Sequence, residues 1–322
     1  MLSNFLLAEV IMPRKLRIDS LKAELISVRA LLAEAQEVGD PVGQIQYKER
    51  LNLIIKEIES IDGEIEALAS VAIYFGGKPV FGSRGILAQF ASVAIEEFQN
   101  LITKVQAVNI LGKIGERGRI PEIVNTDLMI TEITKGSFGF ILEEITTQEP
   151  LFDSSLKNTV DLVSDIIAKT CDINEEYFEE VLSQIDSRVL ISLNKFLMNL
   201  DTNEASLRIV ENDKEFIINE QSAHRGRVRT ETTVIEEEMT PYEGLFIGFL
   251  PDHRKFEFQI DNGEILYGTA TIEATEQYTA LLKQGIGVIN ELWRVNLEVR
   301  IIKPLNRPER QVYKLKEFIQ KL

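Results

Sequence analysis

Two stretches near the start of the chain repeat apolar residues at alternating spacings of three and four. The first run is Leu21, Leu25, Val28, Leu32 and Ala35, and the second is Leu51, Ile54, Ile58, Ile61, Ile65 and Leu68. This spacing places each run on one narrow side of a helix, which is the seam pattern of coiled coils. Gly39, Asp40 and Pro41 separate the runs, because proline cannot continue a helix but opens one well. The pattern predicts an antiparallel helical hairpin over residues 19–69, either folded back on its own domain or exposed as an arm.

The pattern then changes to the alternation of a strand. Val71, Ile73 and Phe75 alternate with smaller or polar positions, and Gly76–Gly77 predicts a tight turn back into a strand at Val80–Phe81. An amphipathic helix follows from residue 87 to residue 105, and Ser83 is its predicted N-terminal cap.

The remainder of the middle region predicts a mixture of strands and helices. Strands are expected over residues 127–134, 137–144, 207–210 and 215–218, and helices near 153–170, 174–184 and 187–200. The charged stretch Arg225–Glu238 predicts a linker, which divides the chain into an N-terminal segment and arm (1–70), an α/β middle domain (71–225) and a C-terminal β domain (240–322). Arg225, Arg227 and Arg229 would share one face of an extended linker, to bind phosphates or to pair with Glu236–Glu238.

The C-terminal segment alternates most regularly. The apolar sets are Leu245, Ile247 and Phe249; Phe256, Phe258 and Ile260; and Trp293, Val295, Leu297, Val299 and Ile301. Asn262–Gly263 predicts a hairpin turn before a strand at 265–270, residues 276–284 predict a short helix, and residues 312–315 predict a last strand. Trp293 is expected to be buried.

This order of three strands, a helix and two strands resembles the oligonucleotide- and oligosaccharide-binding (OB) barrel, which carries a helix between its third and fourth strands. An SH3-like barrel or an open α+β sheet fits nearly as well. The predicted fold class is therefore α+β: a coiled-coil-like hairpin, an α/β middle region and a small barrel-like C-terminal domain.

Charge is distributed unevenly along the 322 residues. The formal net charge is −16, which argues against a general polyanion binder. Residues 241–322, however, contain eleven acidic and eleven basic residues, so the earlier part of the chain carries the whole excess. A neutral C-terminal module can still present a local basic face.

Residues suited to catalysis are scarce. The chain has two histidines (His224, His253) and one cysteine (Cys171), and none of them lies at metal-ligand or nucleophile–base spacing. We therefore expect no catalytic site, metal or cofactor.

One cysteine cannot form an intramolecular disulfide, which favours a reducing, cytoplasmic setting. The apolar start, Met1–Met12, is too short to span a bilayer and is expected to pack on the body.

Two sets of side chains are the candidate binding residues. The candidate anion or nucleic-acid contacts are Arg294, Arg300, Lys303, Arg307, Arg310 and Lys314 in the C-terminal domain, and Lys113, Arg117 and Arg119 in a glycine-rich loop. The candidate protein interface is the second seam, Leu51, Ile54, Ile58, Ile61, Ile65 and Leu68. Solvated loops and strand faces are the commoner meaning of such basic runs, and an internal packing seam is the alternative for the helix.

These observations favour a non-catalytic interaction, assembly or sensor protein that binds a protein partner or itself through the hairpin and the C-terminal domain. The alternative is a nucleic-acid-binding protein that uses the basic face of that domain. A place in a bacterial multi-protein system, such as a stress or anti-phage response, is a hypothesis that no residue pattern supports directly.

Overall fold

The computed structural model describes residues 12–62, 67–111, 126–134, 138–146, 152–304 and 308–322. Within these ranges the chain forms eight α-helices, one short 3-10 helix and twelve strands in three sheets. The predicted segments at residues 1–11 and 112–121 lie outside the described residues. None of the described helices combines the length and apolar character needed to cross a membrane.

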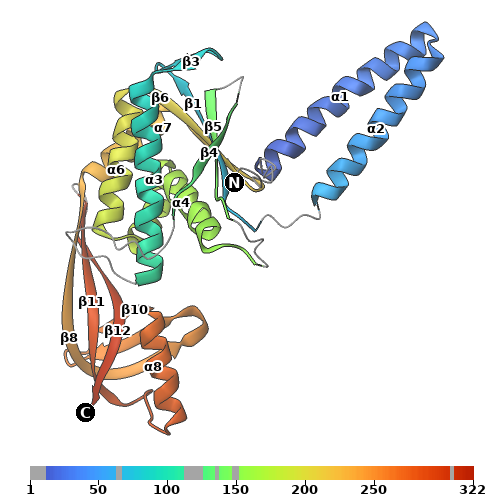
Figure 1. Cartoon of the computed structure of the whole chain (residues 1–322). Helices are drawn as coiled ribbons and strands as arrows, with labels where there is room; N and C mark the ends of the chain where they lie inside the picture. The colour runs from blue at the N-terminus through green and yellow to red at the C-terminus, as the bar shows by residue number, and fades with distance from the viewer. Residues whose placement is uncertain (1–11, 63–66, 112–125, 135–137, 147–151, 305–307) are drawn as a thin grey trace, which may run out of the picture.

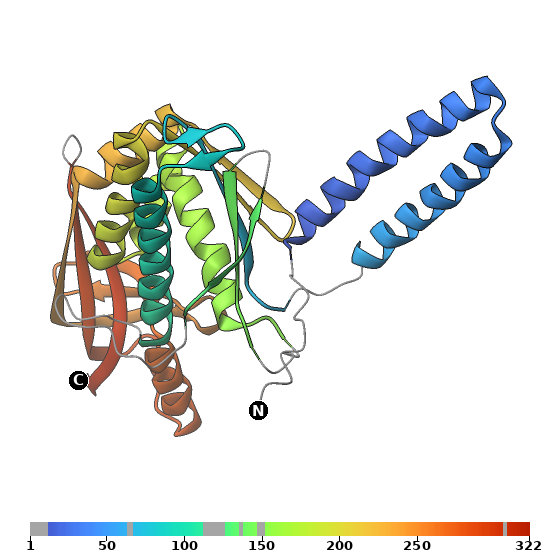
Figure 2. The same ribbon diagram turned by 45° about the horizontal axis from the view of Figure 1, so that its top comes forward.

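The first two helices lie apart from the rest of the molecule (Figures 1 and 2). Helix α1 spans Arg14–Val38 and α2 spans Pro41–Asp62. Gly39, between them, has a φ of 75°, a conformation that glycine adopts without strain. Asp40 then accepts a hydrogen bond from the backbone of Val42 (3.0 Å). We call α1 and α2 together the arm.

The centre of the molecule, here called the body, is a five-stranded antiparallel sheet in the order β4-β5-β1-β6-β7. The strands are β1 (Ser70–Gly77), β4 (Met129–Thr134), β5 (Phe138–Glu143), β6 (Ala205–Glu211) and β7 (Lys214–Ile218). These positions agree with the strands that the alternation predicts. Val71 and Ile73 of β1 face the main core, whereas Ala72 faces the opposite side of the sheet.

Five helices cover one face of this sheet (Figure 2). They are α3 (Ala88–Leu111), α4 (Ser155–Cys171), α5 (Glu175–Gln184), α6 (Ser187–Thr202) and α7 (Glu220–Glu231). The side chains of Ser154, Asn174, Asp186 and Asn219 accept hydrogen bonds from the first turns of α4 to α7, which explains where these four helices begin. The apolar faces of the helices and the sheet form one continuous core.

Two predictions for the start of the body are wrong. The return strand β2 (Val80–Phe81) pairs with β3 (Gly85–Ile86) rather than with β1, which continues through Gly77. Ser83 therefore lies in the β2–β3 turn and does not cap α3, which begins at Ala88.

The predicted linker at residues 225–238 is also wrong, because these residues form α7 and the start of a long strand. The sequence of α7 is strongly polar, so its apolar periodicity is weak. Packing explains the helix instead: Ala223 is fully buried, and a Cβ at Gly226 would lie 2.8 Å from the sulfur of Cys171. Only a residue without a side chain lets α7 approach α4 this closely.

The C-terminal part forms a closed ring of five strands, which we call the ring. Its elements are β8 (Thr233–Leu250), the 3-10 helix η1 (Pro251–His253), β9 (Lys255–Ile260), β10 (Ile265–Ala270), α8 (Ile272–Lys283), β11 (Leu292–Pro304) and β12 (Arg310–Lys321). The strands follow the circular order β8-β9-β10-β12-β11, and β10 and β12 pair in parallel. The predicted succession of three strands, a helix and two strands is confirmed.

The interior of the ring is rich in aromatic side chains. Trp293 is buried at 3% exposure, as predicted, and Val295 and Leu297 are fully buried beside it. On β8 the predicted inward set is only partly right, because Phe246 rather than Leu245 or Ile247 is fully buried. An irregularity in the β8–β9 pairing between Phe246 and Gly248 shifts the alternation by one position, so that Phe249 also faces inward.

Long strands join the ring to the body. Ile235 of β8 and Ile302 of β11 are directly paired, and both belong to the core of the body. The pairing of β8 with β11 runs without a break from Thr233 to Leu245. The ring and the body therefore share continuous strands across the residues where the sequence predicts a domain boundary.

Candidate functional site

The seam predicted as a protein interface lies inside the arm. Ile54 and Ile61 are buried against Leu21 and Val28 of α1, and Leu51 and Ile58 pack partly buried around them. Arg50 Nε also donates to Glu24 (2.7 Å), which links the two helices through an ion pair. These residues are already occupied within the chain. Leu68 lies outside the helix and is half-buried, and Ile65 lies outside the described residues.

The arm nevertheless exposes a second set of large apolar side chains. They are Ile26, Leu31, Val38, Val42, Ile45, Leu53 and Ile55. Val38 is 78% exposed and Ile45 is 68% exposed, on either side of the turn at Gly39. Single exposed apolar residues are ordinary, but a set gathered on one thin hairpin is typical of an interaction surface.

The base of the arm is fixed to the body. The backbone N–H of Lys15 donates to the carbonyl of Asn212 (2.8 Å), and the Lys15 ammonium lies 3.4 Å from Glu215. Met12 and Leu16 pack on the sheet face opposite the main core, against Ala72 and its neighbours. The arm is thus anchored at its start, and the turn between α1 and α2 lies farthest from the body (Figures 1 and 2).

Two of the predicted cationic contacts in the ring are surface residues that pair with β8. Arg294 Nε donates to Glu243 (2.7 Å), and the Lys303 ammonium donates to Glu236 (2.5 Å). Arg294 and Glu243 are directly opposite in the pairing of β8 with β11, and Lys303 and Glu236 are two positions out of register. The acidic run at Glu236–Glu238 therefore neutralises β11 rather than the arginines of residues 225–229.

Arg300 is buried at 4% exposure, so its side chain does not lie on a surface that a nucleic acid could reach. Its Nε lies 3.0 Å from Glu298 and 3.5 Å from Glu237, two carboxylates that are themselves buried. Its Nη1 donates to the carbonyl of Ile185 (3.1 Å), at the end of α5. Arg300 therefore connects the ring to the body.

The other predicted basic contacts divide into two groups. Arg310 Nη2 donates to the backbone carbonyl of Glu179 and pairs with its carboxylate, both at 2.7 Å. Lys113, Arg117, Arg119 and Arg307 lie outside the described residues. The structure thus brings Arg300, Lys303 and Arg310 to the junction of ring and body, but each is paired with carboxylates.

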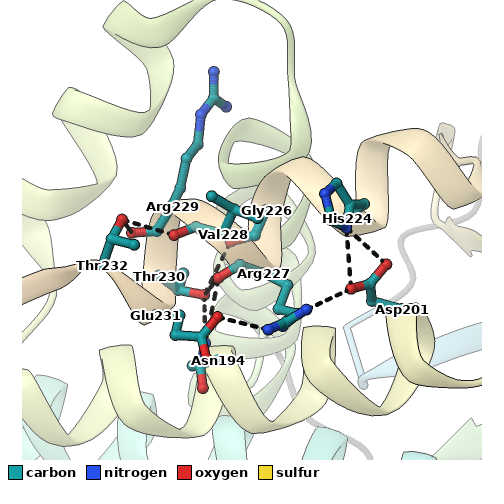
Figure 3. Close-up of polar contacts among 10 residues, drawn as sticks. All are labelled: Asn194, Asp201, His224, Gly226, Arg227, Val228, Arg229, Thr230, Glu231 and Thr232. Atoms are coloured by element: carbon teal, nitrogen blue, oxygen red, sulfur yellow. Dashed lines mark hydrogen bonds and ion pairs between the residues drawn. The ribbon is translucent and has the colours of Figure 1, made fainter. Parts of the chain in front are cut away.

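The arginines of α7 have different surroundings because they lie on a helix rather than an extended linker, and Figure 3 shows Arg227 and Arg229 pointing in different directions. Arg225 Nε donates to the carbonyl of Cys171 (3.1 Å). Arg227 bridges Asp201 (3.1 Å) and Glu231 (2.7 Å). Arg229 is buried and donates to the carbonyls of Thr170 (2.8 Å) and Asp172 (2.6 Å). These arginines hold α7 against α4 and α6 and do not form one cationic face.

His224 lies beside Asp201, with Nδ1 at 3.1 Å from the carboxylate (Figure 3). No nucleophilic side chain is hydrogen-bonded to this histidine among the residues drawn or otherwise described. Cys171 is buried, and burial raises the pKa of its thiol to about 12, so the thiol is not activated.

A cleft lies between the body and the ring, lined by residues from the C-terminal end of α3, from β10 and β12, and from the start of α8. Its volume is about 290 Å³. Val108, Ile110 and Gln184 line it from the body, and Arg254 and Lys314 line it from the ring. Its remaining lining residues are Asn109, Ser183, His253, Thr269, Ala270, Thr271, Ile272, Glu273, Arg300 and Val312.

Lys314 differs from the other basic residues of the ring. Within the described residues it forms neither a salt bridge nor a hydrogen bond through its ammonium. Burial lowers its pKa, and the neighbouring positive charge of Arg300 lowers it further. The strand pairing places Lys314 opposite Glu298, whose charge opposes part of this shift, but the Glu298 carboxylate forms its ion pairs with Arg300 and Lys316.

One carboxyl group of the body has a perturbed pKa. Glu211 is fully buried at the end of β6, and this burial raises its pKa to about 7. Ser164 and Lys214 oppose the shift, whereas Asp161 adds to it through charge repulsion. Within the described ranges no three His, Cys, Asp or Glu side chains lie close enough to hold a metal ion.

Comparisons with protein-family models, with curated proteins and with solved structures find no match for this chain.

Proposed function

We propose that this protein is a non-catalytic assembly protein whose arm binds a second copy of the chain. The observation that carries the proposal is the set of seven exposed apolar side chains on a hairpin that already buries its own seam. Burying such side chains between two arms would release about 25 cal/mol for each Å² of apolar surface removed from water.

The charge distribution of α1 supports a second copy as the occupant. Residues 14–29 contain five basic and two acidic side chains, whereas residues 30–40 contain three acidic and no basic ones. Lys22 and Arg29 of the basic part, and Glu34 and Glu37 near the turn, have no ion pair within the described residues. Two arms that pack in opposite directions would place these unlike charges side by side.

Such an arrangement is self-complementary, as a two-fold symmetric dimer requires. The apolar residues near the turn of one arm, such as Val38 and Ile45, would then meet Ile26 and Leu53 of the other. Association of this kind would make the arm a connector and leave the ring free for a second contact.

Light scattering of the intact chain tests this proposal. We expect a mass of twice the chain mass of 36.5 kDa. Ile45→Asp should return the mass to that of a monomer while the circular dichroism spectrum stays unchanged. Ile173→Asp is the matched control, since Ile173 is 80% exposed on the body. A monomeric wild type, or equal effects of the two variants, would contradict the proposal.

Nucleic-acid binding through the ring is the second candidate. The circular strand order, with α8 between the third and fourth strands, supports the resemblance to an OB barrel. The pairing of Arg294, Lys303 and Arg310 with carboxylates weighs against it. Titration of labelled single strands at rising salt decides the matter, because phosphate contacts weaken steeply with salt. An absence of binding at low salt would remove this candidate.

A further inference from the structure

We infer that the cleft between the body and the ring is a binding site for a small organic phosphate, with Lys314 and Arg254 as the residues that hold the phosphate group. Nothing in this site belongs to the arm, so the inference is independent of self-association.

The first argument is the charge that remains unpaired in the cleft. The chain has 51 acidic residues and only 35 basic ones, so carboxylates are abundant. The other described basic residues of β11 and β12 mostly face one, as in the pairs of Arg300 with Glu298 and of Lys316 with Glu298. Lys314 and Arg254 form no salt bridge in the described structure, although both line the same cleft.

The second argument is the cost of leaving Lys314 in this position. Its ammonium is partly removed from water, and Arg300 lies close enough to oppose its charge. An anion in the cleft would compensate for both effects. Phosphate suits the pair because a lysine supplies a compact positive charge and an arginine supplies several donors in fixed directions.

The third argument concerns size and lining. A volume of about 290 Å³ is at the small end of the range for ligand sites. Apolar side chains also line the cleft, among them Val108, Ile110 and Val312. This space suits a phosphate attached to a small organic group better than a polymer. Glu273 also lines the cleft, and a backbone hydrogen bond at the start of α8 lowers its pKa, with smaller contributions from Thr271, Lys316 and Lys314.

Calorimetric titration of the full chain at low ionic strength tests the inference. The probes are inorganic phosphate, phenyl phosphate and adenosine monophosphate, with adenosine as the uncharged control. We expect both esters to bind more tightly than inorganic phosphate and adenosine not to bind. If adenosine monophosphate binds more tightly than phenyl phosphate, the organic group is a nucleoside, and the reverse order indicates a smaller group.

Two variants locate the site. Lys314→Gln and Arg254→Gln should each weaken binding by about tenfold or more, because a hydrogen bond to a charged group is lost. Lys283→Gln is the matched control, since Lys283 is exposed in the last turn of α8. The dimer-breaking change Ile45→Asp should leave the affinity unchanged. Equal weakening by the variants at residues 314 and 283 would overturn the inference.

A second measurement needs no variant. Acetylation of wild-type lysines, followed by mass spectrometry of the peptides, reports how accessible each amine is. Saturating phenyl phosphate should slow the acetylation of Lys314 and leave that of Lys283 unchanged. No heat of binding together with no protection of Lys314 would overturn the assignment of the cleft.

Discussion

The arm and the ring each satisfy some side chains within the chain and leave others without a partner. In the arm these unsatisfied side chains are apolar, and in the ring the one of interest is charged. The arm buries four apolar residues in its seam and leaves seven large apolar residues in water. The ring buries fourteen residues in its core and also exposes large apolar side chains, such as Leu250 and Tyr267, but its outer strands carry many charges as well. Arg294 and Lys303 of β11 pair with Glu243 and Glu236 of β8, whereas Lys314 of β12 forms no ion pair among the described residues.

This difference shows which residues are available for binding. Ile54 and Arg300 stand out in the sequence, one in an apolar seam and one in a basic stretch. Both are buried, and both are occupied by partners in the same chain. The residues that the fold leaves without partners, such as Ile45 in the arm and Lys314 in the ring, are the better candidates for function.

The largest expected effect is at Arg300. Arg300→Ala would leave Glu298 and Glu237 buried without their shared partner, so we expect the free energy of unfolding to fall by about 3–5 kcal/mol. Denaturant titration measures this change. Arg294→Ala is the control: its ion pair with Glu243 lies on the surface, so the loss should be below about 1 kcal/mol. Similar losses for the two variants would mean that burial does not distinguish these ion pairs.

Ile54→Ala tests whether the apolar packing of the arm is independent of the apolar core of the body. Ile54 is fully buried in the arm, so its truncation should weaken the packing of α1 on α2 by about 2–5 kcal/mol. The cluster around Ile54 shares no residue with the core of the body. Hydrogen exchange should therefore become faster in α1 and α2 and stay unchanged in β1. Ile73→Ala, the matched change in the body, should show the reverse, and faster exchange throughout the chain in both variants would contradict a separate arm.

A smaller effect is expected from Glu211, where a carboxyl rather than an ion pair is buried. Its pKa of about 7 lies above its ordinary 4.5, so the stabilising contribution of its neutral form is complete below pH 4.5. That contribution is lost as the pH rises through 7. Relative to Glu211→Gln, the wild type should lose up to about 3 kcal/mol over this interval. If the free energies of unfolding of the two proteins change in parallel with pH, Glu211 does not cause the pH dependence of stability.

Much of the fold follows from local patterns in the sequence. Gly39 and Pro41 mark where α1 ends and α2 begins, because each has a backbone preference that acts within a few residues. Trp293, Val295 and Leu297 are buried as predicted, but the predicted alternation of β11 fails farther along the strand, where Glu298 and Arg300 are buried and Ile302 is buried in place of Ile301. Caps such as Asn174 and Asp186 likewise coincide with the predicted starts of α5 and α6.

The errors have nonlocal causes. The irregular pairing near Gly248 reverses the face of β8 and depends on β9, which no pattern within β8 contains. Helix α7 packs closely on α4 because Gly226 fits against Cys171, a contact across more than fifty residues. The pairing of Lys303 with Glu236 likewise depends on strand register. The candidate sites could not be separated from structural ion pairs without that register.

Self-association through the arm is the central claim, and Val38→Cys tests it most directly. The native Cys171 is buried and unreactive, so a spin label would attach at position 38 alone. Pulsed electron paramagnetic resonance then measures distances between labels on different chains. We predict a defined intermolecular distance that disappears when Ile45→Asp is added. Labels that show no intermolecular coupling in the otherwise native chain would contradict the claim.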